Sequence, residues 1–233
     1  MAYLTRYLET PIKEDLKKKM VFLSGPRQGG KTTLSKKLLQ DENVDTSRYL
    51  SWDSAMDREN IIREQFSAGP GLLVLDEIHK YSRWRQVMKG LYDKRKDEIK
   101  ILVSGSGRLD YYRHGGDSLQ GRYHFYRLHP LSFKEINAVE RYILSDLFNY
   151  GGFPEPFLLA SERESRRWSK EYRTRVIQED LNSLENVRDL ALLENLVIRL
   201  PDLVGSPLSI NAICKDLQVS HQSVSRWMDM LER

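Results

Sequence analysis

The chain has 233 residues, of which 40% are hydrophobic and 30% are charged, and its formal net charge is +4. This composition is typical of a soluble globular protein, and the length suffices for one large domain or two small ones. No apolar run approaches the roughly 20 residues of a membrane span, and a single cysteine, Cys214, excludes an internal disulfide and a cysteine-based metal cluster.

These exclusions favour a cytoplasmic protein with no membrane partner. The first residues, 1–19, lack the uninterrupted apolar segment and the cleavage site of a signal peptide. The positive net charge permits an anionic partner but does not require one.

The N-terminal part predicts a short helical lead-in, a strand and a helix. The lead-in covers 3–19 and is divided by Pro11. The apolar run 20–23 is expected to form the first strand, and leucines at helical spacing predict a helix that ends near Leu39.

The turn between this strand and this helix matches the phosphate-binding pattern G-x-x-x-x-G-K-[ST]. Backbone N–H groups in such a turn surround the β-phosphate of a nucleotide, and the helix N-terminus adds partial positive charge. Lys31 is expected to reach the β- and γ-phosphates, and the Thr32 hydroxyl to hold Mg²⁺. The sequence therefore predicts a nucleotide site formed by Gly25, Pro26, Arg27, Gln28, Gly29, Gly30, Lys31 and Thr32.

A second nucleotide motif follows one strand later. After a strand at 48–52 and a helix at 58–66, the apolar run 72–75 is typical of a parallel strand buried on both faces. It ends in Asp76, expected to orient Mg²⁺, and Glu77, expected to polarise the attacking water.

Another apolar strand, 100–103, leads into Ser104–Gly105–Ser106. A small polar residue at this strand end is placed to sense the γ-phosphate, and Ser106 is preferred over Ser104 for that role; an ordinary turn is the alternative. A helix at 84–96 precedes this strand, a short helix is expected around 109–119, and a fifth strand at 123–128. This repeated strand–helix pattern predicts an α/β fold: a five-stranded parallel sheet with helices on both faces and ligands at the carboxyl ends of the strands.

The C-terminal part predicts helices only. A charged amphipathic stretch covers 161–184, prolines at 201 and 207 bracket a linker, and 209–233 has the pattern of a helix-turn-helix. Its second helix is expected to present His221, Gln222, Ser225 and Arg226 outward, where they could contact DNA. The alternative is that the module serves only to pack against neighbouring domains.

The ordered motifs resemble a family of prokaryotic AAA-type (AAA+) P-loop ATPases, AAA_14 joined to the nuclease-like DUF4143, which this chain lacks. The motifs that carry the resemblance are Gly25–Pro26–Arg27–Gln28, Gly30–Lys31–Thr32–Thr33, Leu75–Asp76–Glu77, Ser104–Gly105–Ser106, Gly121–Arg122, Pro130–Leu131–Ser132–Phe133 and Gly151–Gly152–Phe153–Pro154–Glu155.

The resemblance implies an AAA+ core at 1–138 with strand order 5-1-4-3-2, a helical lid at 139–200 and a partial winged-helix segment at 201–233. It implies ATP and Mg²⁺ as ligands and adds Thr33 to the P-loop. It also implies that Arg122 acts as an arginine finger on a neighbouring subunit of a homo-oligomer, and that Pro154 belongs to a turn contacting adenine. For Arg122 and Pro154, a surface residue and a helix-joining turn are the alternatives.

Two functions remain in view. The first is an ATPase that uses Glu77 and couples turnover to a DNA or protein partner. The second is a slow nucleotide-dependent switch that presents its C-terminal domain, favoured because no sensor-2 arginine stands out. A small-molecule P-loop kinase is a weaker third reading, because no arginine-rich phosphate-covering lid is recognisable.

Overall fold

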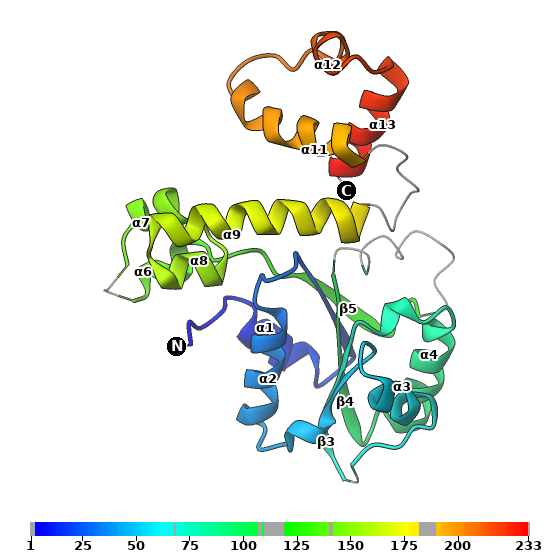
Figure 1. Ribbon diagram of the computed structural model, residues 1–233. Coiled ribbons are helices and arrows are strands. Elements are labelled where there is room, and N and C mark those ends of the chain that lie inside the picture. The colour runs from blue at the N-terminus through cyan, green and yellow to red at the C-terminus, as the bar shows by residue number, and fades with distance from the viewer. Residues whose placement is uncertain are drawn as a thin grey trace. The chain divides into compact units, whose positions relative to one another are not determined.

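The computed structural model describes residues 3–67, 69–106, 109, 119–139, 142–181 and 190–232. The chain divides into two compact units, Met1–Ala160 and Ser161–Arg233, each with its own apolar core. Figure 1 shows the sheet within the first unit, and helices make up the second.

A five-stranded parallel sheet forms the centre of the first unit. Its order is β2-β3-β4-β1-β5 and every neighbouring pair is parallel, which confirms the expected order 5-1-4-3-2. The strands are β1 (Met20–Ser24), β2 (Tyr49–Ser51), β3 (Gly71–Asp76), β4 (Ile99–Ser104) and β5 (Tyr123–Arg127).

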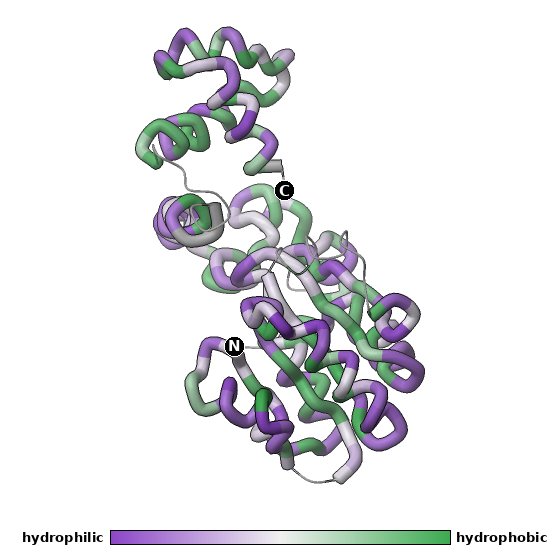
Figure 2. Tube along the Cα trace, turned by 90° about the vertical axis from the view of Figure 1, so that its right-hand side faces the viewer, coloured by the Kyte–Doolittle hydropathy of each residue, from purple (hydrophilic) through white to green (hydrophobic). Residues whose placement is uncertain are grey.

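The strands are apolar along almost their whole length because both faces of the sheet are covered. Figure 2 shows the central strands as largely green, apolar segments. Alternate residues of β1 enter opposite cores: Phe22 packs on one face with Trp84 and Met88, whereas Val21 and Leu23 pack on the other. This is the arrangement expected for a strand buried on both faces.

Helices cover the two faces as predicted. Helices α1 (Glu9–Asp15) and α2 (Lys31–Asp41) lie on one face, and α3 (Ala55–Ile62) and α4 (Trp84–Arg95) lie on the other (Figure 1). On α4 the buried residues are Trp84, Met88 and Leu91, whereas Val87 and Tyr92 are half-buried.

Three short helices complete the first unit and have a small core of their own. They are α6 (Phe133–Asn137), α7 (Leu144–Tyr150) and α8 (Pro154–Leu159). Leu4 of the N-terminal segment packs with Leu131, Ile136 and Phe157 in this core. The N-terminal segment is thereby attached to the elements that follow β5.

In its described residues, 161–181 and 190–232, the second unit comprises α9 (Glu162–Arg175), a π-helical turn η4 (Val176–Leu181), α11 (Leu190–Arg199), a short 3₁₀ turn η5 (Leu200–Leu203), α12 (Ile210–Leu217) and α13 (His221–Glu232). Helices α12 and α13 are the expected helix-turn-helix pair, joined where Gln218 adopts a left-handed conformation. On α13, Val224, Trp227 and Met230 are buried, whereas Met228 and Leu231 are half-buried.

Most differences from the sequence expectations are shifts of element ends. The second strand begins at Tyr49 rather than at residue 48, and the third helix covers Ala55–Ile62 rather than 58–66. The helix expected around 109–119 lies almost wholly outside the described residues. Among the described residues, no helix has the length and apolar character needed to cross a membrane.

Candidate nucleotide-binding site

The P-loop begins where β1 passes very close to the end of β5. A Cβ at Gly25 would lie 2.3 Å from the carbonyl oxygen of Leu128, so this position accepts only glycine. The Leu128 N–H donates to the Ser24 carbonyl at 2.8 Å, and this hydrogen bond joins the end of β1 to the residue that follows β5. The loop therefore leaves the sheet in a fixed direction.

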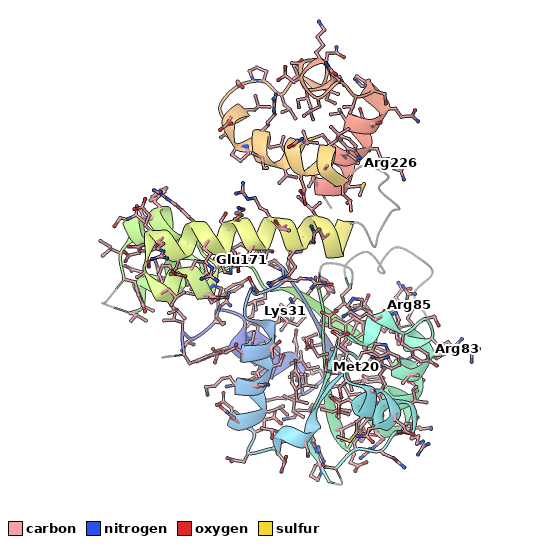
Figure 3. All side chains as sticks on the ribbon, in the orientation of Figure 1. Met20, Lys31, Arg83, Arg85, Glu171 and Arg226 are labelled. Atoms are coloured by element: carbon pink, nitrogen blue, oxygen red, sulfur yellow. The ribbon has the colours of Figure 1, made fainter. Side chains whose placement is uncertain are left out.

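The loop ends at Gly30, which has φ +96° and precedes the first residue of α2. The next residue, Lys31, is 9% exposed, and its Nζ donates to the carbonyl oxygens of Gly25 and Pro26, each at 2.9 Å. The ammonium group thus lies on the carbonyls of the loop in which a phosphate is expected to bind. Figure 3 labels Lys31 beside the sheet.

Asp76 stands at the centre of a polar network formed by the carboxyl ends of β3 and β4 and the first residue of β2. Its Oδ1 accepts from the Ser104 hydroxyl at 2.6 Å, and its Oδ2 accepts from the Tyr49 hydroxyl at 2.6 Å. The same Tyr49 hydroxyl lies 3.5 Å from Oγ1 of Thr32. The two residues expected to hold Mg²⁺, Thr32 and Asp76, are therefore linked through one tyrosine.

Glu77 occupies a strained position next to this network. Its φ is +58°, and its backbone N–H donates to the Ser104 carbonyl at 2.8 Å. Its carboxylate accepts from the Ser106 backbone N–H at 3.0 Å and lies 3.4 Å from the Lys80 ammonium. Left-handed backbone in a residue other than glycine costs free energy and is concentrated at functional sites.

The environment of Glu77 raises its pKa above the ordinary value. Burial of the carboxylate is the largest cause, and the nearby Asp76 adds to it, while Lys80 and Lys31 oppose it. Lys80 is itself held by Asp53, whose two carboxylate oxygens each lie 2.7 Å from its Nζ. Glu77 is thus a carboxylate that accepts a proton more readily than an exposed one.

A cavity of about 430 Å³ adjoins the P-loop. Lys31 and Thr32 of the P-loop line this cavity. Pro154 lies close to the same loop, because a Cβ at Gly30 would be 3.8 Å from Cγ of Pro154. The full lining is Tyr3, Leu4, Arg6, Gln28, Gly30, Lys31, Thr32, Thr33, Leu131, Pro154, Glu155 and Leu158. The lining therefore combines polar and charged side chains with apolar ones.

The turn before α8 positions Pro154 at the cavity. The Leu131 N–H donates to the Gly152 carbonyl at 2.6 Å, and a Cβ at Gly152 would lie 2.6 Å from the Leu131 carbonyl oxygen. Such close contact of two backbones requires glycine at 152. It places Pro154, the first residue of α8, against the cavity.

Comparison with known families agrees with this geometry. Residues 17–137, more than half of the chain, match the sequence profile of a family described as an AAA domain. The chain belongs to this AAA domain family. Residues 141–233 match a different profile, a domain of unknown function (DUF8612), and not the DUF4143 named in the sequence resemblance.

Three relatives of this AAA domain protein carry the name "uncharacterized protein". Rv2008c of Mycobacterium tuberculosis and Mb2031c of Mycobacterium bovis are each 26% identical over 222 residues, covering 91% of this chain and 47% of theirs. MJ1544 of Methanocaldococcus jannaschii is 25% identical, covering 89% of this chain and 52% of its own. The chain spans about half the length of these relatives.

Solved structures with a similar chain path include the Thermotoga maritima RuvB Holliday junction branch migration motor. It is 17% identical, with a TM-score of 0.43 and coverage of 93% of this chain and 82% of that one. The Orc1 protein of Aeropyrum pernix, solved in complex with DNA, is 13% identical, with a TM-score of 0.48 and coverage of 98% and 83%.

The first unit brings most of the predicted site residues together. Gln28, Gly30, Lys31, Thr32, Thr33 and Pro154 line one cavity, and Asp76, Glu77 and Ser106 lie at the ends of the adjoining strands. Gly25 and Gly29 shape the loop backbone; Pro26 contributes a carbonyl to Lys31; Arg27 is half-buried in the loop and is absent from the cavity lining.

Arg122 lies at the opposite end of the sheet from its own P-loop. It directly precedes β5, and its carbonyl accepts from the N–H of Met20, the first residue of β1. Its guanidinium donates to both carboxylate oxygens of Asp93, at 2.9 and 3.3 Å. Figure 3 labels Met20 and Lys31, which lie toward opposite ends of the β1–P-loop unit.

Sequence reasoning missed three residues of this site. Tyr49 was assigned only to a strand, Ser104 was ranked below Ser106, and Arg6 was not singled out in the lead-in. A tyrosine that starts an edge strand has no motif, and its role depends on the register that pairs Tyr49 with Val74, two residues before Asp76. Ser104, by contrast, is the register partner of Asp76.

Proposed function

We propose that the chain is a Mg²⁺-dependent ATPase whose nucleotide lies in the cavity beside the P-loop. The observation that supports this most directly is the cavity itself, which combines two environments: the polar and cationic side chains of Lys31 and Thr32, and the apolar side chains of Leu131 and Pro154. A phosphate chain requires the first environment and a nucleobase the second. Its volume lies within the range of small-molecule sites.

The residues present fit a Mg²⁺ ion. Among the residues that the structure describes, no group of three or more His, Cys, Asp and Glu side chains gathers as a metal cluster. A P-loop site needs none, because Mg²⁺ there takes oxygen ligands from one hydroxyl, water and phosphates, with an acidic residue close by. Thr32 and Asp76 are the residues that would hold it. When bound, Mg²⁺ would neutralise charge that develops on the phosphates.

In this proposal Glu77 takes the proton of the attacking water. Its raised pKa makes it a better proton acceptor than an exposed carboxylate, and the Ser106 N–H holds one of its oxygens in a fixed direction. The Lys80 ammonium balances the negative charge of Glu77 without removing it. Lys31 would leave the Gly25 and Pro26 carbonyls for the stronger acceptor oxygens of a phosphate.

Arg122 would complete the site of a second subunit in a homo-oligomer. It cannot serve its own P-loop, since it lies at the other end of the sheet. Its pairing with Asp93, which raises the pKa of Arg122, keeps it charged but occupied until a neighbour's phosphates compete for it. Other AAA+ subunits would thus be partners of the chain.

A slow nucleotide-dependent switch is the second candidate. The arrangement of Lys31 on the loop carbonyls favours it, because Lys31 must leave them before it can contact a phosphate. In that case the second unit is the part presented to a partner. DNA is one such partner, met by the exposed His221, Gln222 and Arg226 at the start of α13, with the half-buried Ser225 beside them.

Steady-state ATP hydrolysis with Mg²⁺, measured with and without duplex DNA, tests these functions. We expect turnover by the parent chain and none by Lys31→Ala, which also should not bind ATP. Lys37→Ala is the matched control, because Lys37 lies on the same helix but pairs with Asp41 outside the cavity. ATP binding without turnover would favour the switch, and no binding of ATP or ADP by the parent would overturn both.

A further inference from the structure

Arg6 is a buried arginine whose guanidinium joins three separate segments. The residue is 5% exposed. Its Nε donates to Oε1 of Glu135 at 2.8 Å, its Nη1 to the Gly29 carbonyl at 2.8 Å, and its Nη2 to the His129 carbonyl at 2.5 Å. The N-terminal segment, the P-loop and the loop after β5 are thus tied to one side chain.

Glu135, which accepts from Arg6, is buried and accepts further hydrogen bonds from the backbone. Its side chain is 3% exposed, and it also accepts from the Tyr7 N–H at 3.0 Å and the Ser132 N–H at 2.7 Å. Burial alone would raise the pKa of Glu135, but the bonds from Arg6, Ser132 and Tyr7 outweigh it and lower that pKa. Glu135 therefore remains an anion that fixes the direction of the Arg6 plane.

The bond to Gly29 acts on the next peptide group. In a planar trans peptide, the carbonyl of one residue and the N–H of the following residue point in opposite directions. Since the Gly29 carbonyl points at Arg6, the Gly30 N–H points away from it. Gly30 lines the cavity and directly precedes α2, where the first N–H groups have no acceptor within the helix, so its N–H is available to a phosphate.

We propose that Arg6 is a positioning residue of the nucleotide site, which holds the Gly29–Gly30 peptide so that the Gly30 N–H faces the phosphates. The inference rests on the proposed nucleotide function. An arginine suits this position because its planar fork reaches three acceptors at once, whereas a lysine offers a single ammonium group. A Cβ at Gly30 would lie 3.0 Å from Nη1 of Arg6, so the guanidinium directly contacts the loop.

The control is a second buried arginine in a similar setting. Arg48 is 4% exposed and donates to the carbonyls of Ser67 and Gly69, at 2.9 and 2.5 Å, but it does not line this cavity. Arg6→Lys and Arg48→Lys both remove a guanidinium from backbone carbonyls. Only the first should change nucleotide binding beyond what a loss of stability explains.

The experiment measures the dissociation constant of ADP by calorimetry and the melting temperature without ligand, for the parent and both variants. We expect Arg6→Lys to weaken ADP roughly 10- to 100-fold, the loss typical of a hydrogen bond to a charged group. Arg48→Lys should melt earlier yet bind ADP as the parent does. Glu135→Gln, which keeps the acceptor oxygen but removes the charge, should weaken ADP by a smaller factor.

Parent-like ADP binding by Arg6→Lys would overturn the inference while leaving the proposed function intact. Equal loss in Arg6→Lys and Arg48→Lys would also overturn it, since both losses would then reflect stability. If Arg6→Lys does not fold, parent-like ADP binding by Glu135→Gln overturns it instead. Failure of the parent to bind ADP would remove the proposed function, and the inference with it.

Discussion

At the scale of single residues, Glu77 carries the sharpest prediction. Glu77→Gln should bind ATP as the parent does but lose turnover, because the amide has nearly the same shape and cannot accept the proton. Its melting temperature should not fall, since the substitution removes a charge whose burial is unfavourable. Glu59→Gln, on the exposed surface of α3, is the control. Turnover at the parent rate would exclude Glu77 as the base.

The pH dependence of turnover follows from the same residue. A base works only when deprotonated, and the pKa of Glu77 is raised by burial. Turnover should therefore fall, as the pH is lowered, at a pH above the ordinary glutamate pKa of about 4.3. ATP binding measured over the same range separates this loss from weakened affinity. An acid limb at the ordinary glutamate pKa, with binding unchanged, would contradict the role of burial.

Tyr49 gives a prediction about the metal. Its hydroxyl holds Asp76 and lies near Thr32, so Tyr49→Phe should change the affinity for Mn²⁺, used as a spectroscopic substitute for Mg²⁺, in the ADP complex. ADP binding without metal should stay the same, because Tyr49 does not line the nucleotide cavity. Tyr92→Phe, on α4, is the control. Identical Mn²⁺ affinity in both variants would leave Tyr49 a purely structural residue.

At the scale of elements, the sequence predicted the pieces that follow periodic rules. Apolar runs located the buried strands, and the glycine pattern located the P-loop. The sequence could not predict which side chains from different elements contact one another. Arg6 and Glu135 meet at the P-loop, and Tyr49 meets Asp76, through contacts between separate elements. No local pattern encodes such contacts, because they join residues more than 20 positions apart.

Helix α13 allows its two readings to be separated. Trp227 is 7% exposed within the core of the second unit, and truncation of a buried Trp typically costs about 3–5 kcal/mol. Trp227→Ala should therefore melt earlier. If the exposed Arg226 contacts a DNA phosphate, Arg226→Ala should lower the slope of log affinity against log salt by about one. Unchanged DNA affinity at low salt in Arg226→Ala would remove this face from DNA contact.

At the scale of the whole molecule, the proposed oligomer makes the site a shared one. The residues proposed to bind ATP and to accept the proton lie at the carboxyl ends of the strands, whereas Arg122 directly precedes β5. A subunit alone would bind ATP but lack the cation that stabilises the transition state. Arg122→Ala should thus bind ATP normally and hydrolyse it far more slowly, since trans arginines contribute roughly 10³–10⁵ in rate.

Mixing the two inactive variants tests the shared site directly. A mixed oligomer of Arg122→Ala and Glu77→Gln contains interfaces at which an intact Glu77 faces an intact Arg122. We therefore expect turnover to reappear in subunit-exchanged mixtures, although neither variant alone is active. Arg63→Ala mixed with Glu77→Gln is the control for exchange, because Arg63 pairs with Glu59 on the surface of α3. Arg63→Ala keeps both Glu77 and Arg122 and should be active alone. Its mixture with Glu77→Gln should therefore hydrolyse ATP in proportion to the active subunits. If well-exchanged Arg122→Ala and Glu77→Gln mixtures stay inactive, Arg122 does not act on a neighbour's nucleotide.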